Sequence, residues 1–273
     1  MVWPFKPKTR QQIARIEITG AIASDTRQRV LKALEIVKER QYPALLLRID
    51  SPGGTVGDSQ EIYEALKRLQ KNTKIIASFG NISASGGVYI GMGANYIMAN
   101  PGTITGSIGV ILRGNNLERL LDKVGVSFKV IKSGPYKDIL SFDRELTDEE
   151  ERILQDMIDT SYQQFLQTVA GARNLDVNQV KSFADGRIFT GQQALELGVV
   201  DRLGTEEDAR LWALELAGLP PDKTKCQTIE EPKPLLSRLT GNRSQIPPGL
   251  QKTLQRLEFE LEVNGQLLWL YRP

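Results

Sequence analysis

The chain has 273 residues, 40% hydrophobic and 25% charged, and its 35 basic and 33 acidic residues leave a net charge of +2. It contains no histidine and a single cysteine, which excludes a Ser-His-Asp triad, a histidine-ligated metal site and an internal disulfide. The balanced charge argues against a dedicated nucleic-acid-binding protein, which normally concentrates basic residues on one face.

The first twelve residues surround two prolines with Trp3, Phe5 and three basic residues. We expect residues 1–12 to form a flexible segment; the alternative is a weak foot in the headgroup layer of a membrane. The sequence has no run of about 18 apolar residues and no apolar signal-peptide core. It therefore predicts a cytoplasmic or peripherally membrane-associated chain without a signal peptide or transmembrane helix.

Strand and helix patterns alternate from the start of the folded region. Residues 13–18 predict a strand. Apolar residues then recur at helical spacing as far as Val37, and Ser24 or Asp25 is the candidate helix cap. Residues 44–49 (ALLLRI) predict a second, buried strand.

The alternation continues along the chain. A helix is predicted over residues 56–70, and buried strands over residues 74–79 and 96–99. The polar, glycine-containing stretch from Thr103 to Gly109 predicts a loop. Strands that alternate with helices indicate βαβ units and a mostly parallel sheet, so we predict an α/β fold.

Helices dominate the prediction for the middle of the chain. Residues 117–124 predict a short helix and residues 127–131 (SFKVI) a strand. Thr147 and Glu150 form a capping box, which places the start of a long amphipathic helix.

The α/β pattern stops near residue 217. Residues 185–217 predict a turn, a helix, a strand and a helix, after which prolines cluster. We therefore predict one domain over residues 13–217 and a C-terminal extension over residues 218–273. The extension is expected to hold a helix at residues 249–261. Its apolar residues 267–271 favour a packing or subunit contact; the alternatives are core or a peptide that visits a groove.

Two glycine-rich turns directly follow predicted apolar strands, at residues 50–54 (DSPGG) and 84–87 (ASGG). In a parallel α/β fold, sites form at the carboxyl ends of strands. A serine at such a turn can expose its hydroxyl, and two backbone N–H groups from two turns can form an oxyanion hole. The pattern indicates nucleophilic catalysis, although the same short sequences also occur as plain tight turns.

A serine nucleophile needs a base, and without histidine we favour lysine. An ordinary lysine amine, with a pKa of about 10.4, is charged at neutral pH, but burial in a dry pocket favours the neutral form. Spacing does not choose among the lysines of this chain. Lys137 has the best local context because it lies just after a predicted strand, beside glycine and proline.

Four segments resemble the signal peptide peptidase A family, also called protease IV. Residues 81–109 (NISASGGVYIGMGANYIMANPGTITGSIG) resemble its nucleophile region, and residues 131–138 (IKSGPYKD) its catalytic lysine segment. Residues 50–54 match its oxyanion turn, and residues 185–201 (DGRIFTGQQALELGVVD) a late segment of the family. The resemblance implies a ClpP/crotonase-type fold, a spiral of ββα units. It also implies a serine endopeptidase that cleaves apolar peptides such as signal-peptide remnants.

Carried over by position, the resemblance implies a Ser/Lys dyad of Ser85 as nucleophile and Lys137 as general base. Ser107 would accept a hydrogen bond from the lysine amine and orient it. The implied oxyanion hole consists of the backbone amides of Gly86, Gly53 and Gly54. No cofactor and no metal are implied.

The chain departs from the family in three places. Phe142 stands where the family commonly has proline, and a membrane helix found in many relatives is missing. Double-length members take serine and lysine from different halves, whereas this chain has one copy. Ser85 therefore pairs with Lys137 either within one chain or across two copies of a homo-oligomer, and the sequence leaves both open. The expected partners are peptide substrates and further copies of this chain, not nucleic acid; contact with a membrane surface is the alternative that depends on residues 1–12.

Several alternatives remain for the site residues. Ser85 could simply cap the helix that follows it. Ser83 is expected to be structural, Lys132 is the alternative base, and Thr105 could share the role of Ser107.

Other reactive side chains have structural interpretations, and other classes of protein remain open. Asp50 and Asp138 are expected to bind backbone N–H groups or arginine rather than to act as an acid/base pair. Cys226 has no assigned role. The alternatives to a peptidase are a crotonase-like acyl-CoA enzyme and a catalytically silent membrane-associated scaffold.

Overall fold

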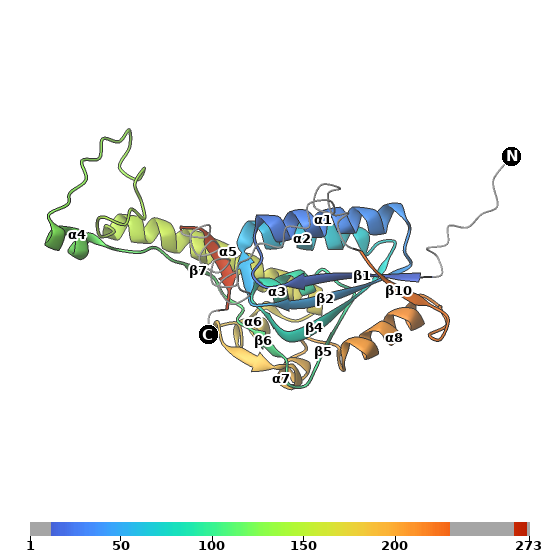
Figure 1. Ribbon diagram of the computed structural model, residues 1–273. Helices are drawn as coiled ribbons and strands as arrows, with labels where there is room; N and C mark the ends of the chain where they lie inside the picture. Colours follow the sequence, from blue (N-terminus) through green and yellow to red (C-terminus); the bar gives the residue numbers. More distant parts are fainter. Residues whose placement is uncertain (1–11, 230–264, 272–273) are drawn as a thin grey trace, which may run out of the picture.

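The computed structural model describes residues 12–229 and 265–271, and Figure 1 shows a twisted sheet covered by helices on both faces. The strands of this sheet are β1 (Gln12–Thr19), β2 (Ala44–Ser51), β4 (Lys74–Ala84), β5 (Tyr96–Ala99), β6 (Ile104–Gly106), β8 (Ile188–Thr190), β9 (Arg202–Leu203) and β10 (Lys225–Thr228). The helices are α1 (Ser24–Glu39), α2 (Val56–Leu69), α3 (Gly86–Gly91), α4 (Glu118–Val124), α5 (Asp148–Arg173), α6 (Val177–Lys181), α7 (Gly191–Glu196) and α8 (Glu206–Leu216).

The main sheet has the order β10-β1-β2-β4-β5-β9, and β6 pairs with the far end of β4 and with β8. Every pairing is parallel except that of β6 with β8. The predicted mostly parallel α/β sheet is therefore confirmed. Parallel strands need helical crossovers, and these place helices on both faces.

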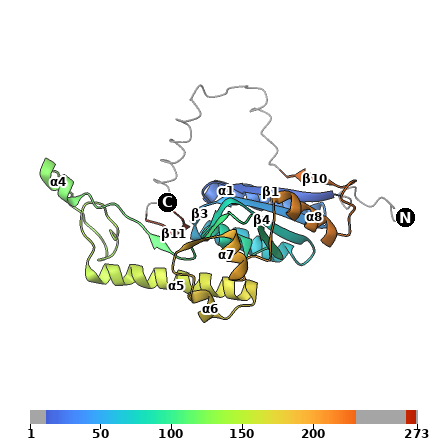
Figure 2. The ribbon, with the colours of Figure 1, turned by 90° about the horizontal axis from the view of Figure 1, so that it is seen from below.

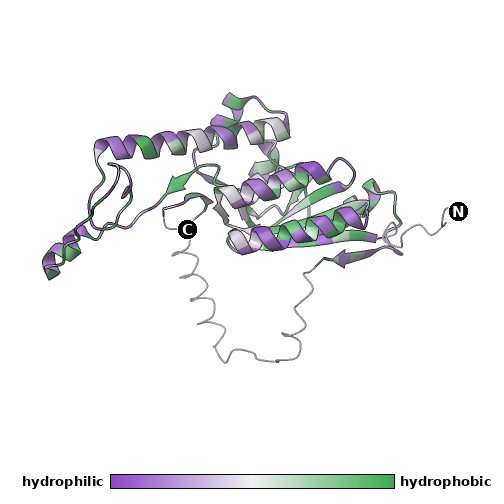
Figure 3. Cartoon of the chain, turned by 90° about the horizontal axis from the view of Figure 1, so that it is seen from above, coloured by the Kyte–Doolittle hydropathy of each residue, from purple (hydrophilic) through white to green (hydrophobic). Residues whose placement is uncertain are grey.

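Alternating side chains of the central strands feed two hydrophobic layers. Ile16 and Leu45 belong to the larger layer, beneath α1, α2, α3 and α5. Ile13 and Leu46 belong to the smaller layer, which packs on Trp212 of α8. α1 and α5 carry both hydrophobic and hydrophilic residues along their length, as amphipathic helices do (Figure 3). Because both faces of β2 are covered, its sequence reads as a continuous apolar run.

A second, small sheet lies beside the main one. It consists of β3 (Gly53–Thr55), β11 (Leu267–Leu270) and β7 (Ile111–Leu112), in the order β3-β11-β7 with antiparallel pairings. Figure 2 shows β11 next to β3. Residues 268–270, far away in the sequence, thus pair with both glycines of the first glycine-rich turn and with Thr55.

Residues 113–147, here called the arm, extend away from the sheet and carry α4 near their tip (Figures 1 and 2). Many apolar side chains of the arm are exposed, among them Leu120 at 56%, Val124 at 63% and Ile131 at 91%. The base of the arm is tied to the start of α5 by Arg144, whose guanidinium pairs with Asp138 and Glu150. The arm therefore offers apolar surface that the described part of this chain does not cover.

Several local predictions differ from the structure. The strand expected at residues 127–131 is wrong: these residues are exposed and have no ladder partner in the described chain. The loop expected from Thr103 to Gly109 contains β6, and Ala23, not Ser24 or Asp25, is the N-cap of α1. The capping box that starts α5 is confirmed.

Two further predictions fall on other parts of the chain. Residues 1–11 and the expected helix at residues 249–261 lie outside the described residues. Within residues 12–229 and 265–271, no helix has the length and apolar character needed to cross a membrane.

Candidate active site

The carboxyl ends of β2, β4 and β6 meet at one edge of the sheet. Ser51 pairs with Ser83, and Ala84 pairs with Gly106 in the parallel ladder. The residues that follow these strands, including Ser85 and Ser107, therefore emerge side by side. The register thus brings together the two glycine turns and the serine predicted to orient the base.

Ser85 occupies a sharp turn between β4 and α3. Its φ is 53° and its ψ is −113°, a conformation that residues with a β-carbon rarely adopt. Its N–H donates to the Gly106 carbonyl at 2.8 Å, which fixes the turn to β6. Such a backbone costs about 1–3 kcal/mol, and conformations of this kind cluster at functional sites.

The Ser85 hydroxyl is buried and has no hydrogen-bond partner in the described part of the chain. Ser85 stands at the N-cap position of α3, yet its side chain makes no capping bond. The alternative that this serine serves as a helix cap is therefore wrong. A buried hydroxyl without a hydrogen-bond partner lowers the stability of the fold. The presence of such a hydroxyl at Ser85 is consistent with a chemical role.

The two glycine turns are in close contact beside Ser85. A β-carbon placed on Gly53, whose φ is 101°, would lie 2.7 Å from the Gly86 nitrogen. One placed on Gly86 would lie 3.2 Å from the Gly54 nitrogen. Only glycine fits these positions. The Gly53 N–H donates to Ser51 Oγ at 3.1 Å, so the amides of Gly54 and Gly86 are the better candidates for an oxyanion.

Ser107 lies at the end of β6, also with a positive φ, of 51°. Its N–H donates to the Arg187 carbonyl at 2.7 Å, and its side chain lines a hollow of about 490 Å³ beside Tyr162 and Leu270. The Thr105 hydroxyl donates to the Ser83 carbonyl at 2.6 Å. Ser107 therefore has the more accessible hydroxyl of the two.

Ser83 is buried, and its hydroxyl also lacks a partner in the described residues. A β-carbon placed on Gly87 would lie 3.2 Å from Ser83 Oγ. Ser83 lies within β4 and has no turn geometry that would expose it, in contrast to Ser85.

Lys137 lies on the arm, and the structure does not bring it to Ser85 within one chain. Its side chain is exposed and has no hydrogen bond or ion pair with any described residue. Lys132 is engaged: its Nζ donates to Asp138 at 2.6 Å and to the Pro135 carbonyl at 2.9 Å. Of the two candidate bases, Lys137 is thus the one with a free amine.

The two aspartates bind the groups expected of them. The Asp50 carboxylate accepts the backbone N–H groups of Asn81 and Ile82. Asp138 pairs with Arg144 and Lys132, whose hydrogen bonds hold its pKa well below the usual range. Neither aspartate is placed for acid/base chemistry at Ser85.

Cys226 is half-buried beside Arg15 and Arg210, and burial raises the pKa of its thiol. A thiol that stays protonated is a poor nucleophile. The structure therefore gives no reason to assign Cys226 a reactive role.

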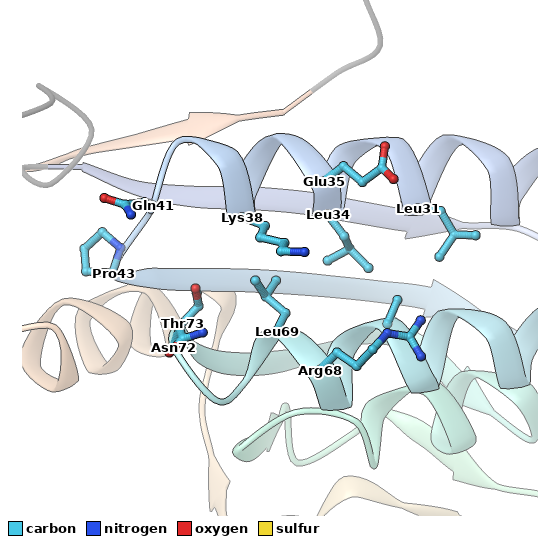
Figure 4. Close-up of a pocket in the computed structure, with 11 residues that line it drawn as sticks. Leu31, Leu34, Glu35, Lys38, Gln41, Pro43, Arg68, Leu69, Asn72 and Thr73 are labelled. Atoms are coloured by element: carbon cyan, nitrogen blue, oxygen red, sulfur yellow. The ribbon is translucent and has the colours of Figure 1, made fainter.

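A hollow of about 950 Å³ lies between α1 and α2 (Figure 4). Leu34, Lys38 and Arg68 line it, together with Pro43 and Thr73. Those last two residues precede β2 and β4, so this hollow opens near the edge of the sheet opposite Ser85. We place the candidate active site at Ser85 and not here.

Comparison with known proteins shows which family the chain resembles. The model of peptidase family S49 matches residues 67–220, and the Clp protease model matches residues 8–103. A Synechocystis sp. protein named as a protease is 72% identical over 277 residues, covering 100% of both chains. An Enterococcus faecium protein named as signal peptide peptidase SppA is 35% identical, covering 90% of this chain and 75% of that protein.

Among solved structures, a ClpP1 variant from Listeria monocytogenes aligns with a TM-score of 0.51 at 18% identity, covering 74% of this chain and 94% of that one. This likeness concerns the fold alone, and it confirms the ClpP/crotonase type.

Proposed function

The chain belongs to peptidase family S49, and from this premise we propose that it is a serine endopeptidase with Ser85 as its nucleophile. One observation carries the proposal: a buried, unpartnered hydroxyl on a strained turn, beside two glycine amides. Family membership favours a peptidase over an acyl-CoA enzyme or a silent scaffold.

The proposed mechanism uses the residues of this chain alone. A neutral Lys137 amine takes the proton of Ser85 as Oγ attacks the scissile carbonyl. The amides of Gly86 and the Gly53-Gly54 turn hold the resulting oxyanion, and Ser107 orients the amine. The charged lysine then protonates the leaving amine, and a water molecule hydrolyses the acyl-enzyme with the same lysine as base.

We further propose that the base comes from a second copy of this chain. Three features support this arrangement: Lys137 is exposed, it lies on an arm that extends away from the sheet, and the arm carries uncovered apolar side chains. Docking of one arm against the neighbouring molecule would bury Lys137 next to Ser85. Burial is also what a lysine base requires, since it favours the neutral amine.

The proposed substrates are apolar peptides such as signal-peptide remnants, in line with the name of the Enterococcus faecium relative. Contact with a membrane surface would bring the enzyme to such substrates.

Complementation tests both the nucleophile and the pairing. Ser85→Ala and Lys137→Ala should each abolish cleavage of a fluorogenic apolar peptide, while Lys132→Ala, the matched control, should retain it. Mixing the two inactive variants should restore activity if the dyad spans two copies, because about a quarter of random interfaces then combine an intact serine with an intact lysine. No restoration, with both variants folded and assembled, would contradict the shared dyad. Full activity of Ser85→Ala would contradict the proposed nucleophile.

A further inference from the structure

Residues 267–271 lie in the position of an extended peptide at the candidate active site. β11 is hydrogen-bonded between β3 and β7, with Trp269 opposite Gly54 and Leu270 opposite Gly53. The Tyr271 N–H donates to the Pro52 carbonyl at 2.7 Å and continues this ladder. Peptides commonly bind proteins as an added strand. The segment therefore shows how a substrate backbone fits this edge.

The register aligns one carbonyl group with the proposed oxyanion site. A β-carbon placed on Gly53 would lie 2.0 Å from the Trp269 carbonyl oxygen, and one placed on Gly86 would lie 3.1 Å from it. These two turns supply the amides proposed to hold the oxyanion. Trp269 thus occupies the position of the substrate residue on the acyl side of the scissile bond. Its side chain marks the pocket that would bind the side chain of that residue.

This pocket is aromatic. The Trp269 side chain is fully buried, with its ring centroid 4.0 Å from that of Tyr89 and 4.8 Å from that of Phe165. Tyr63 packs on Tyr89 at 5.0 Å. Tyr89 lies on α3, four residues after Ser85, so one wall of the pocket is built on the nucleophile helix. Offset and tilted ring contacts of this kind favour aromatic partners over aliphatic ones.

We propose that the pocket formed by Tyr89 and Phe165 makes the enzyme specific for a large aromatic side chain on the acyl side of the scissile bond. This inference rests on the proposed function and names its substrate class. Trp269 Nε1 has no hydrogen-bond partner in the described residues, so the pocket offers the indole N–H no acceptor. Phenylalanine fills the pocket without burying an unpaired donor, and it is therefore the best substrate residue.

Cleavage of a peptide series tests the preference. In Leu-Leu-X-Leu-Tyr substrates, kcat/KM should fall in the order Phe, Trp, Leu, Ala, with Lys not cleaved at X. The Phe peptide should exceed the Ala peptide about tenfold to hundredfold. Equal rates for Phe and Ala, or a preference for Ala, would overturn the proposal.

Changing the pocket wall tests which residues carry the preference. Phe165→Leu should lower the ratio of Phe to Ala cleavage by about tenfold. Phe183→Leu is the matched control: it makes the same change in the same hydrophobic layer, but its ring packs on Phe189 and not on Trp269. A ratio that changes equally in both variants would overturn the assignment.

Two last experiments use variants of Trp269. The first tests whether Trp269 behaves like a bound peptide residue or like a permanent core residue, and the second tests the pocket independently of the proposed chemistry. In the full chain, Trp269→Ala should lower KM for the Phe peptide, because the internal segment competes less. Lower activity on every peptide, together with a lower melting temperature, would assign Trp269 to the core and overturn the proposal. Binding is measured without cleavage on the Ser85→Ala, Trp269→Ala variant. It should bind labelled Leu-Leu-Phe-Leu-Tyr more tightly than the Ala peptide, even if hydrolysis were never observed, and equal binding would also overturn the pocket.

Discussion

Ser85 combines two features that each lower the stability of the fold: a positive φ and a buried hydroxyl without a partner in the described chain. Most positions lose stability when alanine is replaced by glycine, by about 0.5–1 kcal/mol. At Ser85 the sign should reverse, because only glycine relieves the strained backbone.

We therefore expect Ser85→Gly to be more stable than Ser85→Ala by about 1 kcal/mol, although both are inactive. The comparison isolates the backbone, because both variants remove the hydroxyl and only one removes the β-carbon. Calorimetric melting of the two variants measures the difference. A lower melting temperature for Ser85→Gly would show that the turn is not strained.

Gly86 allows a second residue-level prediction. An alanine β-carbon here would lie 2.7 Å from Ser59 Oγ and 3.2 Å from the Gly54 nitrogen. Gly86→Ala should therefore destabilise the fold by about 1–3 kcal/mol and abolish peptide cleavage. Gly57→Ala is the matched control: it lies in the first turn of α2 with open space around the added carbon, and it should be neutral or stabilising. Chemical denaturation of both variants tests the contrast, and equal stabilities would contradict the close packing of the two turns.

At the scale of elements, the junction of the arm and α5 depends on one arginine. Arg144 donates to Glu150 at 2.5 Å and to Asp138 at 2.8 Å, and the buried Glu150 carboxylate also accepts the Thr147 N–H of the capping box. These bonds lower the pKa of Glu150 to about 2, and Arg144 is the larger cause. A carboxyl whose pKa is lowered by folding stabilises the protein above its unfolded pKa, and that contribution is lost as the pH falls toward the folded value.

The junction should therefore loosen as the pH falls from about 4 toward about 2. Hydrogen exchange of residues 138–150, corrected for its intrinsic pH dependence, measures this loosening. Arg144→Ala should give the same loss of protection already at neutral pH. Arg152→Ala, whose pair with Glu149 is exposed, should leave protection unchanged. Unaltered protection in Arg144→Ala would remove the arginine from this role.

Some secondary-structure elements could be predicted from the sequence, and others could not. β1, β2, β4 and α5 follow from apolar runs, helical spacing and a capping box, because these signals are local. β6 reads as a polar turn and forms a strand only because the far end of β4 is free to pair with it. Conversely, residues 127–131 have a strand-like composition but no partner in the described chain.

The candidate site was also predictable only in part. The turns around Ser85 and Gly53 can be found by motif, and their contact follows from parallel register. The relation of Lys137 to Ser85 is not encoded in any local pattern, because in the proposed arrangement it depends on how two copies of the chain assemble. The sequence does not reveal the pocket around Trp269 either. The apolar run at residues 267–271 is the one signal of this pocket, and the run does not identify β3 as the partner strand.

For the molecule as a whole, the nucleophile and the proposed base lie on parts with opposite properties. Ser85 is buried at the edge of the main sheet, whereas Lys137 is exposed on the arm together with Ile131, which is 91% exposed. Large apolar side chains exposed in clusters mark surfaces that bind other proteins. If the partner is a second copy, assembly and catalysis must be lost together.

We expect Ile131→Asp to dissociate the proposed homo-oligomer and to reduce peptide cleavage at least about tenfold, because a carboxylate would be desolvated in the contact. Leu211→Asp is the matched control: Leu211 is also exposed, at 40%, but lies on α8 and away from the arm. It should retain both assembly and activity. Sedimentation at several protein concentrations, with activity measured on the same samples, tests the link. A monomeric but fully active Ile131→Asp variant would mean that Lys137 and Ser85 of one chain come together during catalysis. The exposed arm would then have another role.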